Sequence, residues 1–396
     1  MRVMHIITRL ILGGAQENTL YNCEDLLGEH ADEVLLVTGP AEGPEGDLFE
    51  RARRHQVPIE IVPDLCRAIG PLADLRSARR LTEIVQRFQP DVVHTHSSKA
   101  GILGRAVAWN EKVPAVIHTI HGLAFHPYER WWKNAIYIRA ERWAARRCDR
   151  IISVADAMTK QALAQKIGRA EQYITIHSGM EVEPFLACDQ FRKTTRQRLG
   201  IADNEVVVMK VARLFEWKGH EDVIQAAKLL ASDAPSIRFV FVGGGTWRDR
   251  LERQIAQAGL ANRFIFTGLV PSGEIPSLLS ASDIVVHASY REGLARVLPQ
   301  SLIAGRPVIS YDVDGAREVV LPDRTGCLLA PHDIVGLARS IEELARDAPR
   351  RTRFGRTGQS LFQDLFRHEV MTRKIREVYA ETLASKSERS RSTSKE

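Results

Sequence analysis

The feature that most constrains the fold is an alternation of strand-like and helix-like segments, which runs through most of the 396 residues. In the first half, apolar runs suited to buried strands occur at 3–7, 33–37, 59–62, 92–95, 115–119, 151–154 and 174–176. Segments with helical spacing of apolar residues lie between most of them, at 16–27, 74–88, 99–109, 128–147 and 157–165. This alternation predicts a doubly wound α/β domain, because each crossover helix returns the chain to a parallel strand.

A second alternation follows a stretch at 178–189, which has no periodicity and is interpreted as a linker. Its strand-like runs lie at 206–211, 238–242, 264–267, 283–286, 308–311 and 327–329. Its helical segments lie at 220–231, 247–258, 274–280, 294–304 and 334–346. The predicted fold class is therefore α/β, with two Rossmann-like doubly wound domains of similar size facing a central cleft.

Domain boundaries follow from the same patterns. We expect an N-terminal domain over 1–185 and a C-terminal domain over 186–366. The helical segment at 367–385 has one apolar side and comes after the second domain is complete, so we expect it to cross back and pack on the first. The tail at 386–396 has no apolar residue and is predicted to be disordered.

Composition limits the class of protein. Apolar residues make up 44% and charged residues 26% of the chain, as in soluble globular proteins. The apolar N-terminus is interrupted by His5 and Arg9, so it is interpreted as a first strand and not a signal peptide. Five scattered cysteines without CxxC spacing indicate a reducing, cytoplasmic location. A net charge of +6 suits an anionic ligand or membrane surface, whereas its even spread disfavours nucleic acid.

The stretch at 289–318 combines two predicted strand ends, a polar turn and a helix start. Such strand ends bind anionic ligands, because free N–H groups and the helix dipole face them. We expect the N–H groups of Gly293 and Leu294 to face a phosphate there. Glu292 is placed to accept hydrogen bonds from sugar hydroxyls. Gln300 follows eight residues later, which is about 12 Å along a helix and matches the span from sugar to ribose in a nucleotide diphosphate sugar.

Three further segments suit a diphosphate or nucleotide. Gly13 and Gly14 follow the first strand and open a helix, although an ordinary tight turn has the same pattern. Arg213 and Lys218 precede a helix and form a candidate diphosphate clamp, although surface cations are usually just solvated. Gly268 follows another strand, where a base can lie against backbone or a plain turn can form. The GxGxxG fingerprint is absent, which weighs against a nicotinamide enzyme.

Histidines gather at two other strand ends. His121 precedes a glycine at the end of the fifth strand and is the one best placed to touch a ligand. His96, Ser97 and Lys99 form a donor-rich pocket edge suited to an acceptor, although a helix cap beside a buried histidine explains them equally well. HxxH spacing without a helix or a nearby carboxylate is poor for zinc, so no metal site is predicted.

Taken together, these segments resemble the GT-B glycosyltransferases of family 4. The resemblance spans roughly 1–385 and is carried by GGAQE, VVHTHSSKAGILGR, HTIHG, CDRIISVA, RLFEWKG, FVGGGTWRDRLE, FTGLV, ASDIVVHASYREGLARVLPQSLIAGRPVIS and DGARE, in the family's order. It implies transfer of a sugar from a nucleotide sugar, a UDP-sugar being favoured, with retention of configuration and without a metal or other cofactor.

The resemblance also implies residue roles. His121 and Glu292 would act at the reacting sugar, and the Gly13–Gly14 loop with Arg213 and Lys218 would hold the diphosphate. The second position of the family's E-x7-E motif, which binds the ribose, is Gln300 here. An amide still donates and accepts hydrogen bonds, so ribose binding survives without the charge.

The acceptor is less constrained, and a saccharide or a lipid-linked glycan is expected, as in lipopolysaccharide, exopolysaccharide or glycolipid biosynthesis. The segment 128–150 places one helical ladder of tryptophan, isoleucine and arginine on one side, which suits the cytoplasmic face of a membrane; its members are Trp132, Ile136, Arg139, Trp143, Arg146 and Arg150. A core-packed helix with a solvated basic edge fits the same pattern. Two alternatives to a transferase are a non-catalytic relative that only binds the sugar nucleotide and a sugar-nucleotide epimerase on the same fold.

Overall fold

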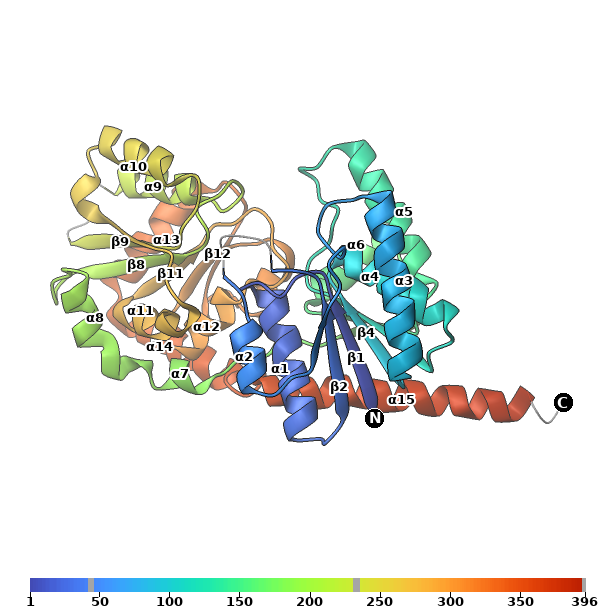
Figure 1. Cartoon of the computed structure of the whole chain (residues 1–396). Helices are drawn as coiled ribbons and strands as arrows, with labels where there is room; N and C mark the ends of the chain where they lie inside the picture. The colour runs from blue at the N-terminus through green and yellow to red at the C-terminus, as the bar shows by residue number, and fades with distance from the viewer. Residues whose placement is uncertain (42–45, 231–235, 394–396) are drawn as a thin grey trace. The chain divides into compact units, whose positions relative to one another are not determined.

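The computed structural model describes residues 1–41, 46–230 and 236–393. The chain divides into two compact units, Met1–Met180 together with Arg367–Glu396, and Glu181–Phe366. Each described unit is built on one parallel sheet with helices on its two faces (Figure 1). The predicted α/β class with two doubly wound sheets is confirmed. The boundary between the units falls five residues before the predicted one.

The first unit holds a seven-stranded sheet within the described residues, in the order β3-β2-β1-β4-β5-β6-β7. Its strands are β1 (Arg2–Ile7), β2 (Glu33–Thr38), β3 (Ile59–Ile61), β4 (Val92–His96), β5 (Ala115–Ile120), β6 (Arg150–Ser153) and β7 (Tyr173–Thr175). Its helices are α1 (Gly14–Gly28), α2 (Phe49–Arg54), α3 (Pro71–Phe88), α4 (Ser98–Asn110), α5 (Trp131–Ala145), α6 (Asp156–Ala164) and α15 (His368–Thr393).

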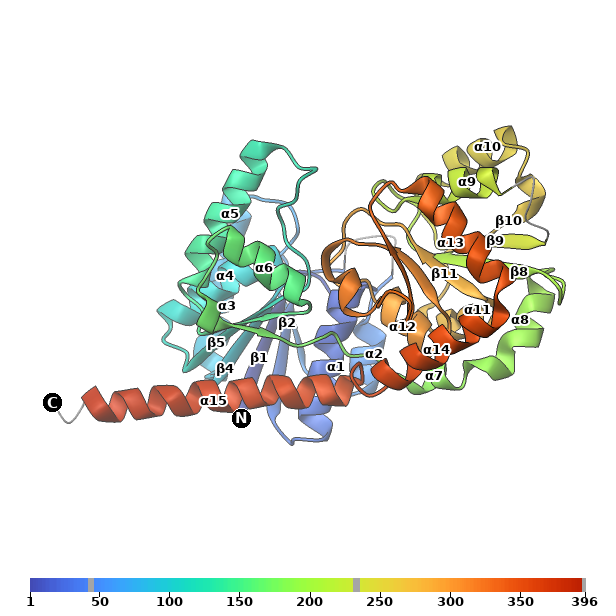
Figure 2. The same ribbon diagram turned by 180° about the vertical axis from the view of Figure 1, so that it is seen from behind.

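Alternating residues of each strand supply two separate cores. Val3 packs into a cluster with Leu20 of α1 and Tyr379 of α15, whereas Met4 packs into another with Leu81 of α3. Figures 1 and 2 show α1 on one side of the sheet and α3 and α4 on the other. The period of two along a strand thus decides which helices each residue meets.

Helix α15 completes the first of these cores, with Met371, Ile375, Val378 and Tyr379 buried against it. The prediction of a disordered tail from residue 386 is wrong for 386–393, which continue the helix. The last three residues of this predicted tail, 394–396, lie outside the described residues. Lys386 explains part of the extension, because its Nζ donates to Asp149 Oδ2 at 2.7 Å and lies over the Trp109 ring. A contact between residues so distant in sequence leaves no local signal.

The second unit holds a six-stranded sheet within the described residues, in the order β10-β9-β8-β11-β12-β13. Its strands are β8 (Val206–Val211), β9 (Ile237–Val242), β10 (Phe264–Gly268), β11 (Ile284–His287), β12 (Val308–Tyr311) and β13 (Gly326–Leu329). Its helices are α7 (Glu183–Leu186), α8 (Arg192–Arg198), α9 (His220–Leu229), α10 (Arg248–Gln257), α11 (Ile275–Ala281), α12 (Val297–Ile303), α13 (Ile334–Arg346) and α14 (Ala348–Phe362).

Several local expectations for the helices need correction. The stretch interpreted as a structureless linker contains α7, and sequence patterns missed α2, α8 and α14. Helix α12 begins at Val297, three residues after the predicted start, so Pro299 falls in its first turn, where a missing N–H costs no helix hydrogen bond. The predicted helix at 220–231 ends at Leu229 in the structure, and residue 231 lies outside the described residues.

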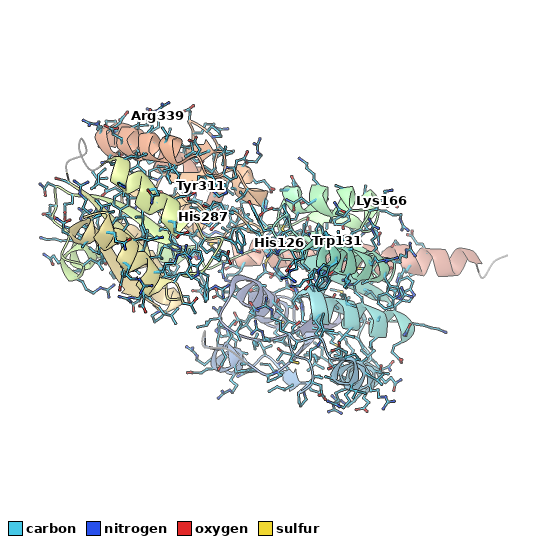
Figure 3. The ribbon with its side chains drawn as sticks, turned by 90° about the horizontal axis from the view of Figure 1, so that it is seen from above. His126, Trp131, Lys166, His287, Tyr311 and Arg339 are labelled. Carbon is cyan, nitrogen blue, oxygen red and sulfur yellow. The ribbon has the colours of Figure 1, made fainter. Side chains whose placement is uncertain are left out.

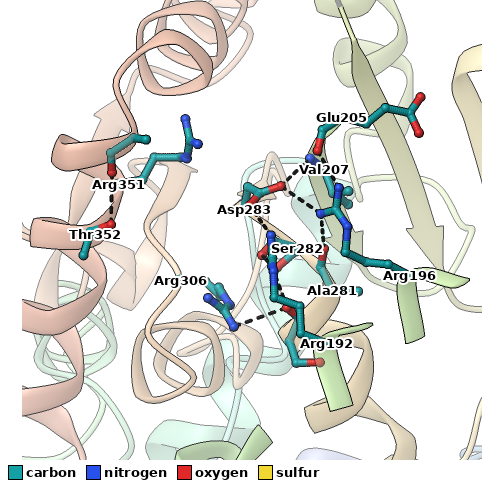
Figure 4. A network of polar contacts seen from close by, with 12 residues as sticks. Arg192, Arg196, Glu205, Val207, Ala281, Ser282, Asp283, Arg306, Arg351 and Thr352 are labelled. Carbon is teal, nitrogen blue, oxygen red and sulfur yellow. Dashed lines mark hydrogen bonds and ion pairs between the residues drawn. The ribbon is translucent and has the colours of Figure 1, made fainter. Parts of the chain in front are cut away.

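A partly buried ionic network joins the amino ends of the two central strands in the second sheet (Figure 4). Asp283, just before β11, accepts from the Val207 N–H of β8 at 2.8 Å and from Arg192 at 2.6 Å. Arg196, almost fully buried, donates to the same carboxylate at 3.3 Å and to the carbonyl oxygens of Ala202 and Glu205. The network fixes β8 beside β11 before either strand reaches its carboxyl end.

The core of the first unit also contains imidazoles. His5 of β1 and His94 of β4 are register partners and both are fully buried. Burial lowers the pKa of His5 to about 3. Burial, followed by the neighbouring histidines, lowers the pKa of His94 well below its usual value. These rings are therefore neutral in the folded chain near pH 7.

We predict that Arg196→Met lowers the free energy of unfolding by about 3 kcal/mol, because it takes one cation from the largely buried Asp283 carboxylate and leaves the carbonyl groups of Ala202 and Glu205 without their guanidinium donor. Urea denaturation of the full chain measures the change. Arg346→Met is the matched control, because it removes an exposed pair with Glu342 on α13 and should cost less than about 1 kcal/mol. Equal losses in the two variants would contradict the structural role of the network.

We predict that the free energy of unfolding falls as the pH is lowered from 7.5 to 5. An unfolded histidine has a pKa of about 6.5, so between this value and the folded value the unfolded chain binds more protons. For His5 the loss at pH 5 is about 2 kcal/mol. His5→Asn should flatten the pH dependence by that amount in urea titrations, whereas Met4→Leu, which keeps the imidazole, should not. A wild-type slope retained in His5→Asn would contradict the assignment.

Candidate functional site

The strand order of the second sheet reverses between β8 and β11, so the loops that follow these adjacent strands leave in opposite directions. Ligands of open parallel sheets bind at such a switch point, beyond the carboxyl ends of the strands. The loop after β8 carries Lys218, and the loop after β11 carries Glu292. Lys218 Nζ donates to Glu292 Oε1 at 2.5 Å. The structure thus brings these two predicted site residues together.

Glu292 is held by a second loop as well as by Lys218. Its backbone N–H donates to Asp314 Oδ2 at 2.7 Å, and the Gly315 N–H donates to the Gly293 carbonyl oxygen at 3.0 Å. Burial alone would raise the pKa of Glu292, but the positive charge of Lys218 beside it holds that pKa below its usual value. An ionised carboxylate is therefore ready to accept hydrogen bonds.

Gly219 lets the Lys218 loop approach the end of β11. Its φ is +64°, and a Cβ there would lie 1.8 Å from the Ala288 carbonyl oxygen, so no other residue fits without displacing backbone. The Tyr290 N–H also donates to the Trp217 carbonyl oxygen at 2.8 Å. Backbone contacts between the two loops therefore fix the spacing of the charged pair.

Buried titratable groups lie behind this pair, and sequence reasoning missed them. His287 Nε2 lies 3.6 Å from Glu292 Oε1, and burial lowers the pKa of His287 to about 3 (Figure 3). Burial, followed by the charge of Lys218, lowers the pKa of Lys210 to about 7. A lysine in the apolar run VVVMKV was the available signal for Lys210. His287 is therefore neutral near pH 7, whereas Lys210 carries part of a positive charge there.

The other residues of this unit that were predicted to bind the nucleotide sugar lie at several different places. Arg213 is exposed on the Lys218 loop, with its guanidinium 5.2 Å from the Phe215 ring centroid. Gly268 ends β10, the edge strand two positions from β8, so it lies away from the switch point. Leu294 is buried, and Gln300 is half-buried on α12. The span of about 12 Å assumed a continuous helix, but residues 292–296 are not helical, so that estimate does not apply.

In the first unit the strand order reverses between β1 and β4, and predicted residues follow both strands. Gly13 is the N-cap of α1, and Gly14 is its first residue. Ser97 is the N-cap of α4, and its Oγ lies 2.7 Å from Thr8 Oγ1 at the end of β1. Gly13 has extended backbone, but a Cβ would meet the Gln16 side chain at 2.7 Å. This switch point brings together Gly13, Gly14 and Ser97.

His121 lies at the end of β5, half-buried, with His96 directly behind it. His96 Nδ1 is 3.1 Å from His121 Nε2, and His96 itself is only 1% exposed. The expectation that His96 contacts an acceptor is therefore corrected, because its ring is covered and both nitrogens are hydrogen-bonded. Lys99, also predicted to bind an acceptor, is paired with Asp74 at 2.5 Å.

Among the described residues, His5, His94 and His96 form a group whose ligand atoms all lie within 4.8 Å of one another. The nitrogens of His94 are paired with hydroxyl groups, Nδ1 with Tyr379 at 2.5 Å and Nε2 with Thr119 at 2.7 Å. His5 Nδ1 is 3.0 Å from His96 Nε2. Hydrogen bonding thus accounts for most of the ring nitrogens in this group.

Helix α5 carries most of the ladder predicted to suit a membrane surface, but Arg150 does not belong to it, because that residue begins β6. Only Ala144 and Ala145 of this helix are fully buried. Trp131, the first residue of the helix, is 81% exposed (Figure 3). Trp132, Ile136 and Trp143 are exposed as well. The alternative of a core-packed helix is therefore not what the structure has. In the described part of the chain, the length and apolar content of the helices fall short of what a membrane span requires.

Comparisons with known proteins agree with this geometry. Residues 191–361 match the family model of group 1 glycosyl transferases, and residues 13–179 match that of the glycosyl transferase 4-like domain. A UDP-Gal:alpha-D-GlcNAc-diphosphoundecaprenol alpha-1,3-galactosyltransferase of Escherichia coli is 28% identical over 350 residues, which is 88% of this chain and 88% of the relative. A 2-deoxystreptamine N-acetyl-D-glucosaminyltransferase of Streptomyces fradiae is 27% identical over 356 residues, 86% of this chain and 84% of the relative.

Solved structures share the fold over nearly the whole chain. The structure of Anabaena Alr3699/HepE in complex with UDP has a TM-score of 0.82 and 22% sequence identity, and covers 96% of this chain and 100% of that one. A sucrose-phosphate synthase from Thermosynechococcus elongatus has a TM-score of 0.81 at 20% identity, covering 97% and 100%. The two family models together span most of the chain, and the chain belongs to the GT-B glycosyltransferases of family 4 type.

Proposed function

We propose that this glycosyltransferase moves a sugar from a UDP-sugar to a saccharide or lipid-linked acceptor, with retention of configuration, in the synthesis of an envelope polysaccharide or glycolipid. The observation that carries the proposal is the Lys218–Glu292 pair at the switch point of the second sheet. It offers a cation and an ionised carboxylate 2.5 Å apart, at the place where a parallel sheet binds its ligand.

Lys218 and Arg213 bind the diphosphate of the donor in this proposal. Negative charge grows on the diphosphate as the bond to the sugar breaks, and fixed cations stabilise that charge without a metal. Glu292 accepts hydrogen bonds from sugar hydroxyls once a donor displaces it from Lys218. Gln300 takes the ribose through its amide, and the N–H groups of Gly293 and Leu294 face phosphate.

In the first unit, the Gly13–Gly14 start of α1 presents free N–H groups to the donor. His121 touches hydroxyls of the sugar that is transferred. The acceptor hydroxyl attacks the anomeric carbon on the face that the diphosphate leaves, which keeps the configuration. Ser97 borders the acceptor in this proposal, because its N-cap position lies at the switch point beside Gly13.

Names of related proteins support the choice of UDP. The Escherichia coli relative is named as a transferase of galactose from UDP-Gal to a diphosphoundecaprenol-linked sugar. Structures of Anabaena Alr3699/HepE contain UDP or UDP-glucose. A capsular polysaccharide glycosyltransferase of Staphylococcus aureus is a further relative, at 22% identity. These names favour a UDP-sugar donor and a polysaccharide product for this chain.

We expect a UDP-sugar to stabilise the purified protein without added metal, by about 2.7 kcal/mol at 100 times its Kd. Thermal shift with UDP-, GDP- and ADP-sugars, and with UDP alone, measures this. Lys218→Met should lose stabilisation by UDP and by UDP-sugar, because the cation meets the diphosphate. Glu292→Gln should keep the response to UDP and lose turnover, because its partner is the sugar.

Arg346→Met is again the control and should respond like the wild type. The absence of a shift with every nucleotide sugar would refute the donor site. Stabilisation without transfer to any acceptor would favour the non-catalytic alternative, and conversion of the donor sugar without an acceptor would favour the epimerase. Retention is checked by NMR of the anomeric proton in the product.

The exposed ladder of α5 leads us to propose that the chain acts at the cytoplasmic face of a membrane. Trp132, Ile136 and Trp143 would insert among lipid headgroups, and Arg139 and Arg146, both exposed, would meet phosphates. A lipid-linked acceptor would reach the active site from that surface.

We predict that the protein cosediments with vesicles containing anionic phospholipid, and that salt weakens the binding. The double variant Trp132→Ser, Trp143→Ser should bind at least about tenfold more weakly, because it removes two of the large apolar side chains that would leave water on binding. Val335→Ser, which changes an exposed apolar residue on α13, is the control and should bind normally. Equal binding by all three proteins would contradict the proposal.

A further inference from the structure

Behind His121 lies a chain of hydrogen-bonded imidazoles that the proposed reaction does not yet use. His5 Nδ1 is 3.0 Å from His96 Nε2, and His96 Nδ1 is 3.1 Å from His121 Nε2. His5 lies in β1 and His96 in β4, whereas His121 directly follows β5; neighbouring rings have centroids 5.3 Å apart and interplanar angles of 16° and 28°. Three strands therefore hold these rings in line, with His121 at the outer end.

The three rings lie on one face of the sheet because of their spacing. His94 and His96 alternate with Thr95 along β4, and His94 is the register partner of His5. His118 faces the other side of the sheet, where its Nδ1 contacts Thr95 Oγ1 at 2.9 Å. His94 packs beside the rings of His5 and His96, but its own nitrogens are hydrogen-bonded to Tyr379 and Thr119. The relay therefore consists of His5, His96 and His121.

Neutral imidazole has one N–H donor and one acceptor nitrogen, so a row of neutral rings must point its N–H groups in one direction. Burial lowers the pKa of His5 to about 3 and that of His121 to about 4. Burial, followed by the neighbouring histidines, lowers the pKa of His96 well below its usual value. All three rings are thus neutral near pH 7, and only two arrangements of protons are available.

The buried end of the relay distinguishes the two arrangements. His5 Nε2 is buried and has no hydrogen-bond partner among the described residues. If the N–H groups pointed inward, this atom would carry a proton with nothing to accept it. If they point outward, it keeps only an unused lone pair. A buried donor without an acceptor is the rarer and more costly case, so the outward arrangement is favoured.

We propose that His5 and His96 act as positioning residues that fix the tautomer of His121. His5 Nδ1–H donates to His96 Nε2, and His96 Nδ1–H donates to His121 Nε2. His121 is then left with its proton on Nδ1, the nitrogen that the relay does not use. The ring consequently offers a donor, and not an acceptor, to an oxygen of the sugar. This last step rests on the proposed function, whereas the tautomer itself does not.

The tautomer is read directly by long-range ¹H–¹⁵N NMR of the full chain labelled at histidine nitrogens, with His121→Gln used to assign the signal. The expected spectrum at pH 7.5 has His121 Nδ1 protonated and Nε2 unprotonated. His5→Leu removes the first donor and should give His121 a mixed or reversed tautomer. His5→Asn is the matched control, because its amide N–H occupies the place of Nδ1–H and should retain the wild-type pattern.

Kinetics give a second readout. His5→Leu should lower kcat by about tenfold with KM for the UDP-sugar changed less than about twofold, and His5→Asn should restore most of kcat. A His121 ring protonated on Nε2 in the wild type would overturn the proposal, as would a tautomer unchanged in His5→Leu. The proposal would also be overturned if one equivalent of zinc shifted the ¹⁵N NMR signals of His5, His94 and His96 completely, because the cluster would then be a metal site.

The tautomer test and the donor test fail separately. A chain that shows the expected tautomer but is not stabilised by any nucleotide sugar refutes the proposed function and leaves the relay standing. A chain that is stabilised by a UDP-sugar but has the opposite tautomer refutes the relay alone.

Discussion

One carboxylate holds the arrangement on which the donor site depends. Asp283 joins β8 to β11 at their amino ends, through the Val207 N–H and two arginines. β8 and β11 are far apart in the sequence but lie side by side in the sheet. The loops at their carboxyl ends carry Lys218 and Glu292. The ionic network around Asp283 therefore lies at the other end of these strands from the candidate site. By holding the two strands together, it also makes the loops that follow them neighbours. The stabilising ion pairs thus lie at the amino ends of the strands, and the candidate site lies at their carboxyl ends.

Backbone contacts finish the placement that the strands begin. Gly219 lies against the end of β11, Tyr290 is hydrogen-bonded to the Trp217 carbonyl, and Asp314 holds the Glu292 N–H. None of these contacts depends on a charged side chain that a ligand would need. Lys218 and Glu292 are therefore free to exchange their mutual pairing for contacts with a donor while their loops stay in position.

The sequence allowed the fold class and most strands to be predicted, because buried parallel strands are short apolar runs bounded by turns. Both Lys218 and Glu292 were placed at strand ends from the sequence, but the ion pair between them was not predicted. For His96 the sequence left two alternatives open, an acceptor contact and a buried histidine beside a helix cap, and it could not decide between them because its hydrogen bonds to His5 and His121 come from segments far apart in sequence. The helical end of α15 was missed for the same reason, since Asp149 pairs with Lys386 across a long separation. Lys210 was overlooked inside an apolar run.

Helix α15 has a consequence for how the protein is made. Its buried face covers Leu20 and Tyr21 of α1, and its polar side chains pair with Asp25 and Asp32. Those partners are synthesised before the second unit, and α15 only after it. The second unit is complete on the ribosome before the first can close its core. Until then this core lacks the side chains that α15 contributes, so the nascent chain carries an apolar surface that a chaperone can recognise.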